Sequence, residues 1–186
     1  MEARAVMFID GENLVARFQD MVSSGRKQKT GVEHEKDCFV WSDGIGGLAY
    51  ASMLRINYYA TVVGDDLRID SIRKKLGSMV THTALSRNPP VLAKVIPRLY
   101  KKESKSQRSR ILDVEIAIDM MKAVHQTDVD TILLFSGDGD FLSLVHEVTR
   151  RSSKHLLLAA FSSGLNKELP DAVDAYRCLD GMFFEQ

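Results

Sequence analysis

Short apolar runs that alternate with amphipathic segments organise this chain. The clearest run is Thr131–Phe135, which is apolar and β-branched enough for a strand buried on both faces. Helical periodicity follows it, because Phe141, Leu144, Val145 and Val148 repeat at the spacing of one helix face. A buried strand followed by an amphipathic helix is the building unit of a parallel α/β sheet.

The same alternation predicts further elements. Besides Thr131–Phe135, the expected strands are Ala5–Ile9, Leu54–Val63, His155–Phe161 and an edge strand at Tyr176–Leu179. The expected helices are one beginning at Leu14, then Gly46–Met53, Asp66–Met79, Leu112–His125 and a short one at Leu165–Leu169. Val91–Tyr100 fits either a strand or a short helix, and Pro97 argues against a central strand. We therefore expect one Rossmann-like three-layer α/β domain over residues 1–186, with a mainly parallel sheet.

Two segments interrupt this alternation. Residues 19–44 are polar without a steady period, so we expect a polar insertion there, with a flexible loop at Ser23–Lys29. Lys101–Arg110 is basic and poor in apolar residues, so we expect a loop or a disordered arm.

Composition narrows the class of protein. The chain is 45% hydrophobic over 186 residues, which fits one domain with a full core. No apolar run approaches the ~20 residues of a membrane span, and no signal peptide is recognisable at the N-terminus. Cys38 and Cys178 lie far apart and form no metal-binding pattern. We expect a reduced, cytoplasmic protein without a membrane partner.

Charge is divided unevenly along a chain whose net charge is zero. Residues 87–110 hold eight basic side chains and one acidic, whereas residues 111–186 hold six basic and thirteen acidic. A basic strip beside an acid-rich half suits a metal-dependent enzyme acting on nucleic acid, in which cations hold phosphates and carboxylates hold the metal. On charge alone, a solvated basic loop that keeps the chain soluble is the simpler interpretation.

Aspartates follow the predicted strands at the positions where the chain turns into a helix. Asp10 follows the first strand, Asp138 and Asp140 follow Thr131–Phe135, and Asp113 lies inward in the first turn of Leu112–His125. The carboxyl ends of parallel strands meet at one edge of a sheet, so we expect these carboxylates to converge there. Hard oxygen donors in such a group suit Mg²⁺ or Mn²⁺, which can activate water for phosphodiester hydrolysis.

Neighbouring polar residues have supporting or local roles. Asn13 and Ser136 could orient a phosphate or hold an acid by hydrogen bonds. Asp140 is equally well explained as a cap of the following helix. Asp119 falls on the polar stripe of its helix, where pairing with Lys122 three residues later is the simpler interpretation.

Three segments together resemble a known family. FIDGEN at Phe8–Asn13, LDVEIAIDMM at Leu112–Met121 and LLFSGDGDF at Leu133–Phe141 are similar to the NYN domain of LabA-like proteins, a branch of the PIN-like nucleases. The resemblance implies a PIN-like parallel sheet, an acidic metal site at its carboxyl edge and RNA as substrate. It also implies site residues: Asp10, Asp113, Asp138 and Asp140 as the catalytic and metal-binding acids, supported by Asn13, Ser136 and Asp119.

The chain departs from that family pattern in places that bear on the substrate. Arg110-Ile111 stands where the family often has a lysine-glycine pair before the Asp113 position. Ser152-Ser153-Lys154 stands where a glycine-lysine pair commonly precedes the later strand, and the polar insertion after Phe18 is not typical. The acids are unchanged, so these departures affect substrate choice rather than chemistry.

The sequence therefore favours a Mg²⁺- or Mn²⁺-dependent ribonuclease. The alternative is a non-catalytic RNA- or protein-binding regulatory module that retains the acidic pocket. A phosphohydrolase or a receiver-type domain fits less well, because Glu12 stands where the phosphohydrolase pattern has aspartate. Glu12 itself is expected to be an exposed acid of the turn. The expected partner is RNA, and the sequence does not decide whether the chain forms a homodimer. The residues expected to contact RNA phosphates lead into Asp113 and are Lys101, Lys102, Lys105, Arg108 and Arg110.

Overall fold

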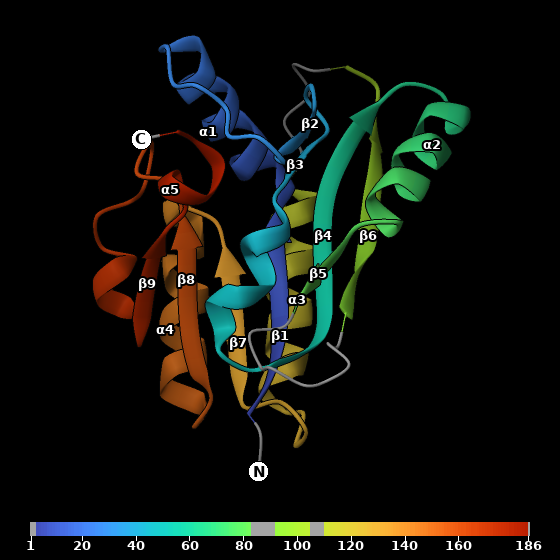
Figure 1. The fold of residues 1–186 in the computed structure, drawn as a ribbon. Helices are drawn as coiled ribbons and strands as arrows, with labels where there is room; N and C mark the ends of the chain where they lie inside the picture. The colour runs from blue at the N-terminus through green and yellow to red at the C-terminus, as the bar shows by residue number, and fades with distance from the viewer. Residues whose placement is uncertain (1–2, 83–91, 105–109, 186) are drawn as a thin grey trace.

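One sheet of seven strands runs through the part of the chain that this computed structural model describes, residues 3–82, 92–104 and 110–185 (Figure 1). Its strand order is β5-β6-β4-β1-β7-β8-β9, and every neighbouring pair is parallel except β5 with β6. The strands are β1 Arg4–Asp10, β4 Ser52–Val63, β5 Val80–His82, β6 Leu92–Lys102, β7 Thr131–Phe135, β8 His155–Ala160 and β9 Ala175–Cys178.

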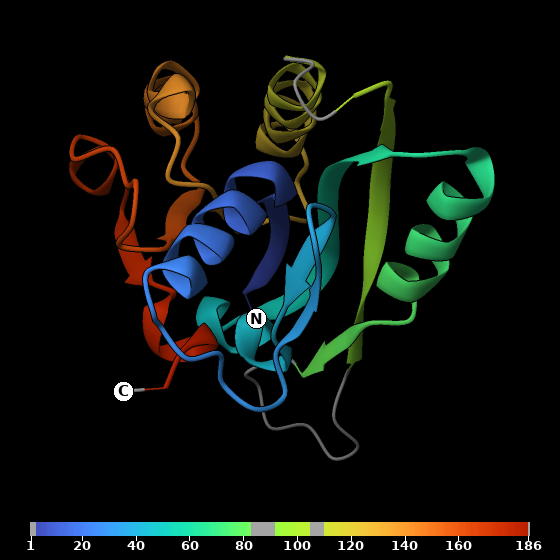
Figure 2. The ribbon, with the colours of Figure 1, turned by 90° about the horizontal axis from the view of Figure 1, so that it is seen from above.

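Helices cover both faces of this sheet (Figure 2). α1 (Gly11–Ser23) and α2 (Asp66–Gly77) pack on one face, and α3 (Ile111–Val124) and α4 (Leu142–Arg151) pack on the other. The shorter elements are the β2–β3 hairpin at Glu33–Glu35 and Phe39–Trp41, α5 at Asp180–Phe183, and 3₁₀ helices at Asp43–Ala49, Gly139–Phe141 and Pro170–Ala172. The expected α/β fold with a mainly parallel sheet is confirmed.

β1 and β7 form the centre of the sheet because their side chains are apolar on both faces. Ala5, Met7 and Ile9 pack into the core under α1, whereas Val6 and Phe8 pack into the core under α3 and α4. After β1 the chain crosses to the α1 face, and after β7 it crosses to the α4 face. The carboxyl ends of β1 and β7 are therefore a topological switch point, the place where open α/β sheets bind ligands.

The segment at residues 19–44 contains more structure than its polar composition indicated. α1 continues to Ser23, and the β2–β3 hairpin follows the expected loop. Phe39 and Trp41 are fully buried in the core under α1. The expected helix at Gly46–Met53 is wrong, because a 3₁₀ helix occupies Asp43–Ala49 and β4 already begins at Ser52.

The ambiguous segment Val91–Tyr100 belongs mostly to a strand, β6, which tolerates proline for a structural reason. β5 pairs only with Leu92–Lys94, so Pro97 lies where that side of β6 has no neighbouring strand among the described residues. Its missing N–H therefore breaks no ladder on that side. The short helix expected at Leu165–Leu169 is not formed; turns occupy that stretch, and Pro170 begins a 3₁₀ helix.

The basic segment at residues 101–110 is divided by the structure. Lys101 and Lys102 end β6, Arg110 directly precedes α3, and residues 105–109 lie outside the described residues. No helix in the described ranges has the length and apolar character needed to cross a membrane.

Candidate acidic site at the carboxyl edge of the sheet

Asp10 is the buried centre of the site. It ends β1 and caps α1, and its Oδ1 accepts a hydrogen bond from the Asn13 backbone N–H at 3.1 Å. Its Oδ2 accepts from the Ser136 hydroxyl at 2.8 Å, and only 3% of the residue is exposed. Ser136 reaches Asp10 because β1 and β7 are parallel neighbours, with Ile9 paired to Phe135 at their ends.

The turn after β7 is held to the start of α1 by a small hydrogen-bond network. The Gly137 N–H donates to Asn13 Oδ1 at 3.0 Å, and the Asp138 N–H donates to Ser136 Oγ at 3.1 Å. Asp138 Oδ1 in turn accepts from the Asp140 N–H at 3.0 Å. Asn13 and Ser136 thus lie between the two turns and fix the position of Asp10 relative to Asp138.

Asp113 joins this group from α3 on the other face of the sheet. It lies half-buried in the first turn of the helix, where the helix dipole favours a carboxylate. Burial raises the pKa of Asp113, and the negative charges of Asp138, Asp140 and Glu12 raise it further. Burial likewise raises the pKa of Asp10 from 3.8 to about 7 against the two hydrogen bonds, with Asp113 and Asp138 adding to the rise.

The donor chemistry of this edge fits a hard divalent cation. The neighbouring negative charges make ionisation of Asp10 and Asp113 more costly, and a bound cation would offset that cost. Within the described ranges, no group of three or more His, Cys, Asp or Glu side chains stands where it could hold a metal ion. Mg²⁺ usually keeps several waters and binds through one or two carboxylates, so the fit is to a partly hydrated ion.

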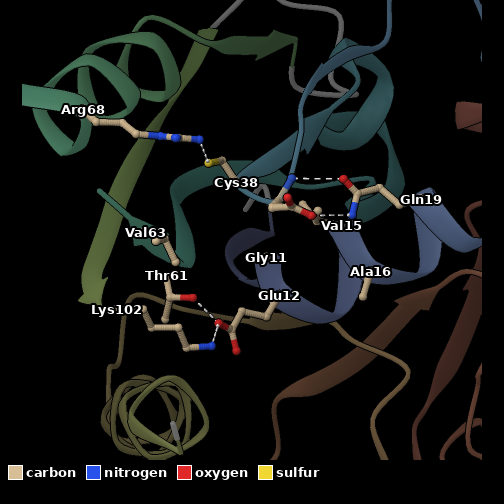
Figure 3. Close-up of a pocket in the computed structure, with 11 residues that line it drawn as sticks. Gly11, Glu12, Val15, Ala16, Gln19, Cys38, Thr61, Val63, Arg68 and Lys102 are labelled. Carbon is tan, nitrogen blue, oxygen red and sulfur yellow. Dashed lines mark hydrogen bonds and ion pairs between the residues drawn. The ribbon is translucent and has the colours of Figure 1, made fainter. Parts of the chain in front are cut away.

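Glu12 is a neighbour of the site that sequence reasoning missed by treating it as an exposed turn acid. Its Oε1 accepts hydrogen bonds from the Thr61 hydroxyl and the Lys102 ammonium (Figure 3). The negative charge of Glu12 contributes to the raised pKa of Asp113. The partner Lys102 lies ninety residues away, so no local signal connects the two; the position of Glu12 inside the FIDGEN segment was the only available indication.

Asp119 lies apart from these acids, more than a full turn beyond Asp113 along α3. Its pairing with Lys122, at 3.0 Å, is as the sequence suggested, but its Oδ2 also accepts from the buried Tyr59 hydroxyl at 2.8 Å. Although burial opposes it, these two hydrogen bonds lower the pKa of Asp119. The residue therefore fastens α3 to β4.

The predicted RNA-contacting residues point in different directions. Lys101 pairs with Asp66 of α2 at 2.8 Å, whereas Lys102 on the opposite face of β6 pairs with Glu12. Arg110 is exposed before Asp113 and its charge opposes the rise in the pKa of that carboxyl. Lys105 and Arg108 lie outside the described residues.

Two arginines that sequence reasoning did not single out line a hollow beside α3. Arg55 of β4 and Arg98 of β6 are exposed and line a cavity of about 240 Å³, together with Asp119 and Lys122 of α3. Tyr59 and Arg98 are paired across β4 and β6, so both side chains lie on the α3 face of the sheet. The available signal was the four-residue spacing of Lys94, Arg98 and Lys102, which places them on one face of a strand. The same spacing also fits one face of a helix, so it did not distinguish the two.

Comparisons with known proteins agree with this architecture. Residues 4–180 match the family model of the NYN domain. A 65-residue stretch is 42% identical to the protein named "Low amplitude and bright protein LabA" of Synechococcus elongatus, covering 35% of this chain and about a third (33%) of that relative. A crystal structure of a protein of unknown function from Vibrio parahaemolyticus has a TM-score of 0.63 at 18% identity, over 99% of this chain and 97% of the other. The structural likeness establishes the fold.

Proposed function

Because the chain belongs to the NYN domain family, we propose that it is a metal-dependent ribonuclease that hydrolyses RNA phosphodiester bonds at the acidic site. NYN domains form part of the PIN-like nuclease superfamily, whose nucleases generally use divalent metal ions, and NYN domains act on RNA. The observation that carries the proposal is the placement of Asp10, Asp113 and Asp138 around the switch point of the sheet. There the charges of Asp113 and Asp138 raise the pKa of the buried Asp10, and the charge of Asp138 raises the pKa of Asp113.

We propose that a partly hydrated Mg²⁺ or Mn²⁺ ion binds here through one or two of the carboxylates of Asp10, Asp113 and Asp138, with waters between it and the others and Asp140 beside them. When bound, such an ion polarises the scissile phosphate and lowers the pKa of a coordinated water. Asp10 is held in place by the Ser136 hydroxyl and the Asn13 N–H, so its carboxylate keeps one orientation. Rigid positioning of this kind is what a catalytic group requires.

RNA contacts are proposed on both sides of Asp113. Arg110 is exposed immediately before α3, in the segment that also contains Lys105 and Arg108. Arg55 and Arg98 lie on the α3 face of the sheet and make no ion pair in the part of the chain that the structure describes. Their charge is available for phosphates, which dominate the affinity of nucleic-acid binding.

A second function, a non-catalytic RNA- or protein-binding regulatory module, is favoured by one observation. The described residues contain no ready-made group of three metal ligands. In a module of this kind the acids would remain as a polar pocket, and RNA binding would not depend on a divalent ion.

Cleavage of end-labelled single-stranded RNA separates these two functions. The wild type is assayed with Mn²⁺, Mg²⁺ or EDTA beside Asp138→Asn, and Asp171→Asn serves as a matched control because Asp171 is exposed at a 3₁₀ helix outside the acidic site. The proposal predicts metal-dependent cutting by the wild type and the control, and none by Asp138→Asn. Equal cutting by all three proteins, or none by a folded wild type with metal, would contradict it.

A further inference from the structure

A cavity of about 280 Å³ opens beside Glu12, at the carboxyl ends of β4 and β6 (Figure 3). α1 forms one wall, the β2–β3 hairpin closes a second side, and the start of α2 lies at the rim. Apolar groups line much of it, from Val15 and Ala16 of α1, Cys38 at the hairpin and Val63 of β4. The cavity therefore has an aliphatic floor and a polar rim.

The charged groups at the rim are largely satisfied, with one exception. Glu12 holds Lys102 and Thr61 on one wall. On the other side, Asp37 Oδ1 accepts from the Gln19 amide at 3.1 Å. Among the described residues, the Arg68 guanidinium donates its one hydrogen bond to the Cys38 sulfur, at 3.7 Å, and makes no ion pair.

That contact leaves most of the hydrogen-bonding capacity of Arg68 unused. A thiol is a weak acceptor, whereas guanidinium presents a planar fork of donors that matches phosphate. The rim as a whole holds two acids and two bases, so it is not a simple anion site. A ligand that suits it presents a flat, weakly polar body to the floor and one phosphate to Arg68.

We propose that this cavity holds one nucleotide of the RNA, with its base against the aliphatic floor and its phosphate at Arg68. The inference rests on the ribonuclease function proposed above and assigns it a substrate subsite. Ligand pockets typically measure about 300–1,000 Å³, so the cavity has room for a single nucleotide rather than a length of chain. The location fits, because Gly11 and Glu12 at its wall directly follow Asp10.

The subsite depends on the part of the chain that departs from the family pattern. Cys38 and Asp37 reach the cavity only because the β2–β3 hairpin, inside the polar insertion after Phe18, folds over it. The insertion thereby supplies one side of a nucleotide site next to the shared acids. We infer that the hairpin sets which nucleotide lies beside the bond that is cut.

The test is a titration of the protein with AMP and UMP, followed by the NMR signals of the Val15 and Val63 methyl groups. Ribose 5-phosphate and inorganic phosphate are the probes without a base. The inference predicts that both mononucleotides shift these signals, and that the two baseless probes bind at least about tenfold more weakly. Equal binding of ribose 5-phosphate would overturn the placement of the base.

Two variants and one control make the test specific. Ala16→Phe fills the cavity from an exposed position of α1, and Arg68→Ala removes the unpaired cation. Each is expected to weaken mononucleotide binding by roughly tenfold or more. Arg68→Ala loses a charge-assisted hydrogen bond to the phosphate, and Ala16→Phe takes the space in which the base would be buried. Arg73→Ala on the same helix, which pairs with Asp70 outside the cavity, is expected to bind as the wild type does. Unchanged binding by both Ala16→Phe and Arg68→Ala would overturn the inference.

The outcomes also separate this inference from the nuclease assignment. RNA cleavage that is lost in Asp138→Asn, together with valine signals that no mononucleotide moves, would overturn the subsite and leave the nuclease standing. Mononucleotide binding in the cavity of a wild type that cuts no RNA would support the nucleotide site and overturn the nuclease.

Discussion

Replacing Asp10 with asparagine is expected to stabilise the metal-free protein. Asp10 is 3% exposed, and its burial raises the pKa of the carboxyl from 3.8 to about 7. At pH 8 the folded protein must therefore carry a buried negative charge beside Asp113 and Asp138. Asparagine keeps an oxygen that can accept the Asn13 N–H and removes that charge.

The magnitude follows from the difference in pKa between the folded and unfolded chain. About three pKa units at 1.36 kcal/mol each give a cost of about 4 kcal/mol. In the variant the Ser136 hydroxyl no longer donates to a charged carboxylate, and this loss reduces the gain in stability by about 1 kcal/mol. We expect the variant to be more stable than the wild type by about 3 kcal/mol at pH 8.

The sign of the pH dependence is also determined. Between about pH 4 and 7 the unfolded chain has lost the Asp10 proton while the folded chain keeps it, so the wild type becomes less stable as pH rises. Below about pH 4 both states hold the proton and the cost disappears. The advantage of Asp10→Asn should therefore shrink by about 2–3 kcal/mol between pH 8 and pH 5.

Urea denaturation in EDTA at pH 5 and pH 8 measures this difference. Asp171→Asn is the control, because Asp171 is an exposed acid outside the site, and its stability relative to the wild type should hardly change with pH. A variant Asp10→Asn that is less stable than the wild type at pH 8, or whose advantage is the same at both pH values, would refute the reasoning.

Three further variants test other parts of the structure. Tyr59→Phe should lower the free energy of unfolding by about 1–2 kcal/mol in urea denaturation, because the Asp119 carboxylate loses a buried donor. Ser136→Ala removes a hydrogen bond that lowers the pKa of Asp10, so the acidic limb of the cleavage pH profile should move to higher pH. Arg98→Ala should weaken RNA binding and reduce the slope of affinity against salt concentration by about one, as measured by fluorescence anisotropy.

Each of these variants has an outcome that contradicts its premise. Tyr59→Phe with unchanged stability would show that the contact with Asp119 contributes nothing. A cleavage profile of Ser136→Ala that is unmoved, or moved to lower pH, would contradict the role of that hydroxyl. Lys74→Ala is the control for RNA binding, because Lys74 is an exposed residue of α2. An equal loss of affinity in both variants would contradict the assignment of Arg98 to the RNA-binding surface.

The centre of the fold and the position of the acids could be predicted because the signals are local. β1 and β7 are continuous apolar runs that end in Asp10 and in Ser136–Asp140, and parallel strands bring such ends to one edge. Asp113 was placed from the periodicity of its helix alone. These features depend on neighbouring residues and on a general rule of sheet topology.

The remaining features depend on partners distant in sequence. Phe39–Trp41 is a three-residue apolar run among polar neighbours. It becomes core only because it packs against α1 and because the Tyr58 hydroxyl of β4 forms hydrogen bonds with the Val40 backbone. Glu12 was interpreted as exposed because its partner Lys102 was not expected on a strand. Lys102 ends β6, and Pro97 within that segment argued against a strand. Arg68, at the cavity proposed to hold a nucleotide, has no sequence signal, since that cavity forms between α2 and the β2–β3 hairpin.

The most direct test of the central claim is anomalous X-ray diffraction from crystals grown with Mn²⁺. We predict an anomalous peak at the carboxyl edge of β1 and β7, next to the carboxylates of Asp10, Asp113 and Asp138, and no such peak in crystals of Asp138→Asn. A wild-type crystal with Mn²⁺ bound only elsewhere, or with no peak at this edge at saturating Mn²⁺, would contradict the assignment of these acids as the metal site of a ribonuclease.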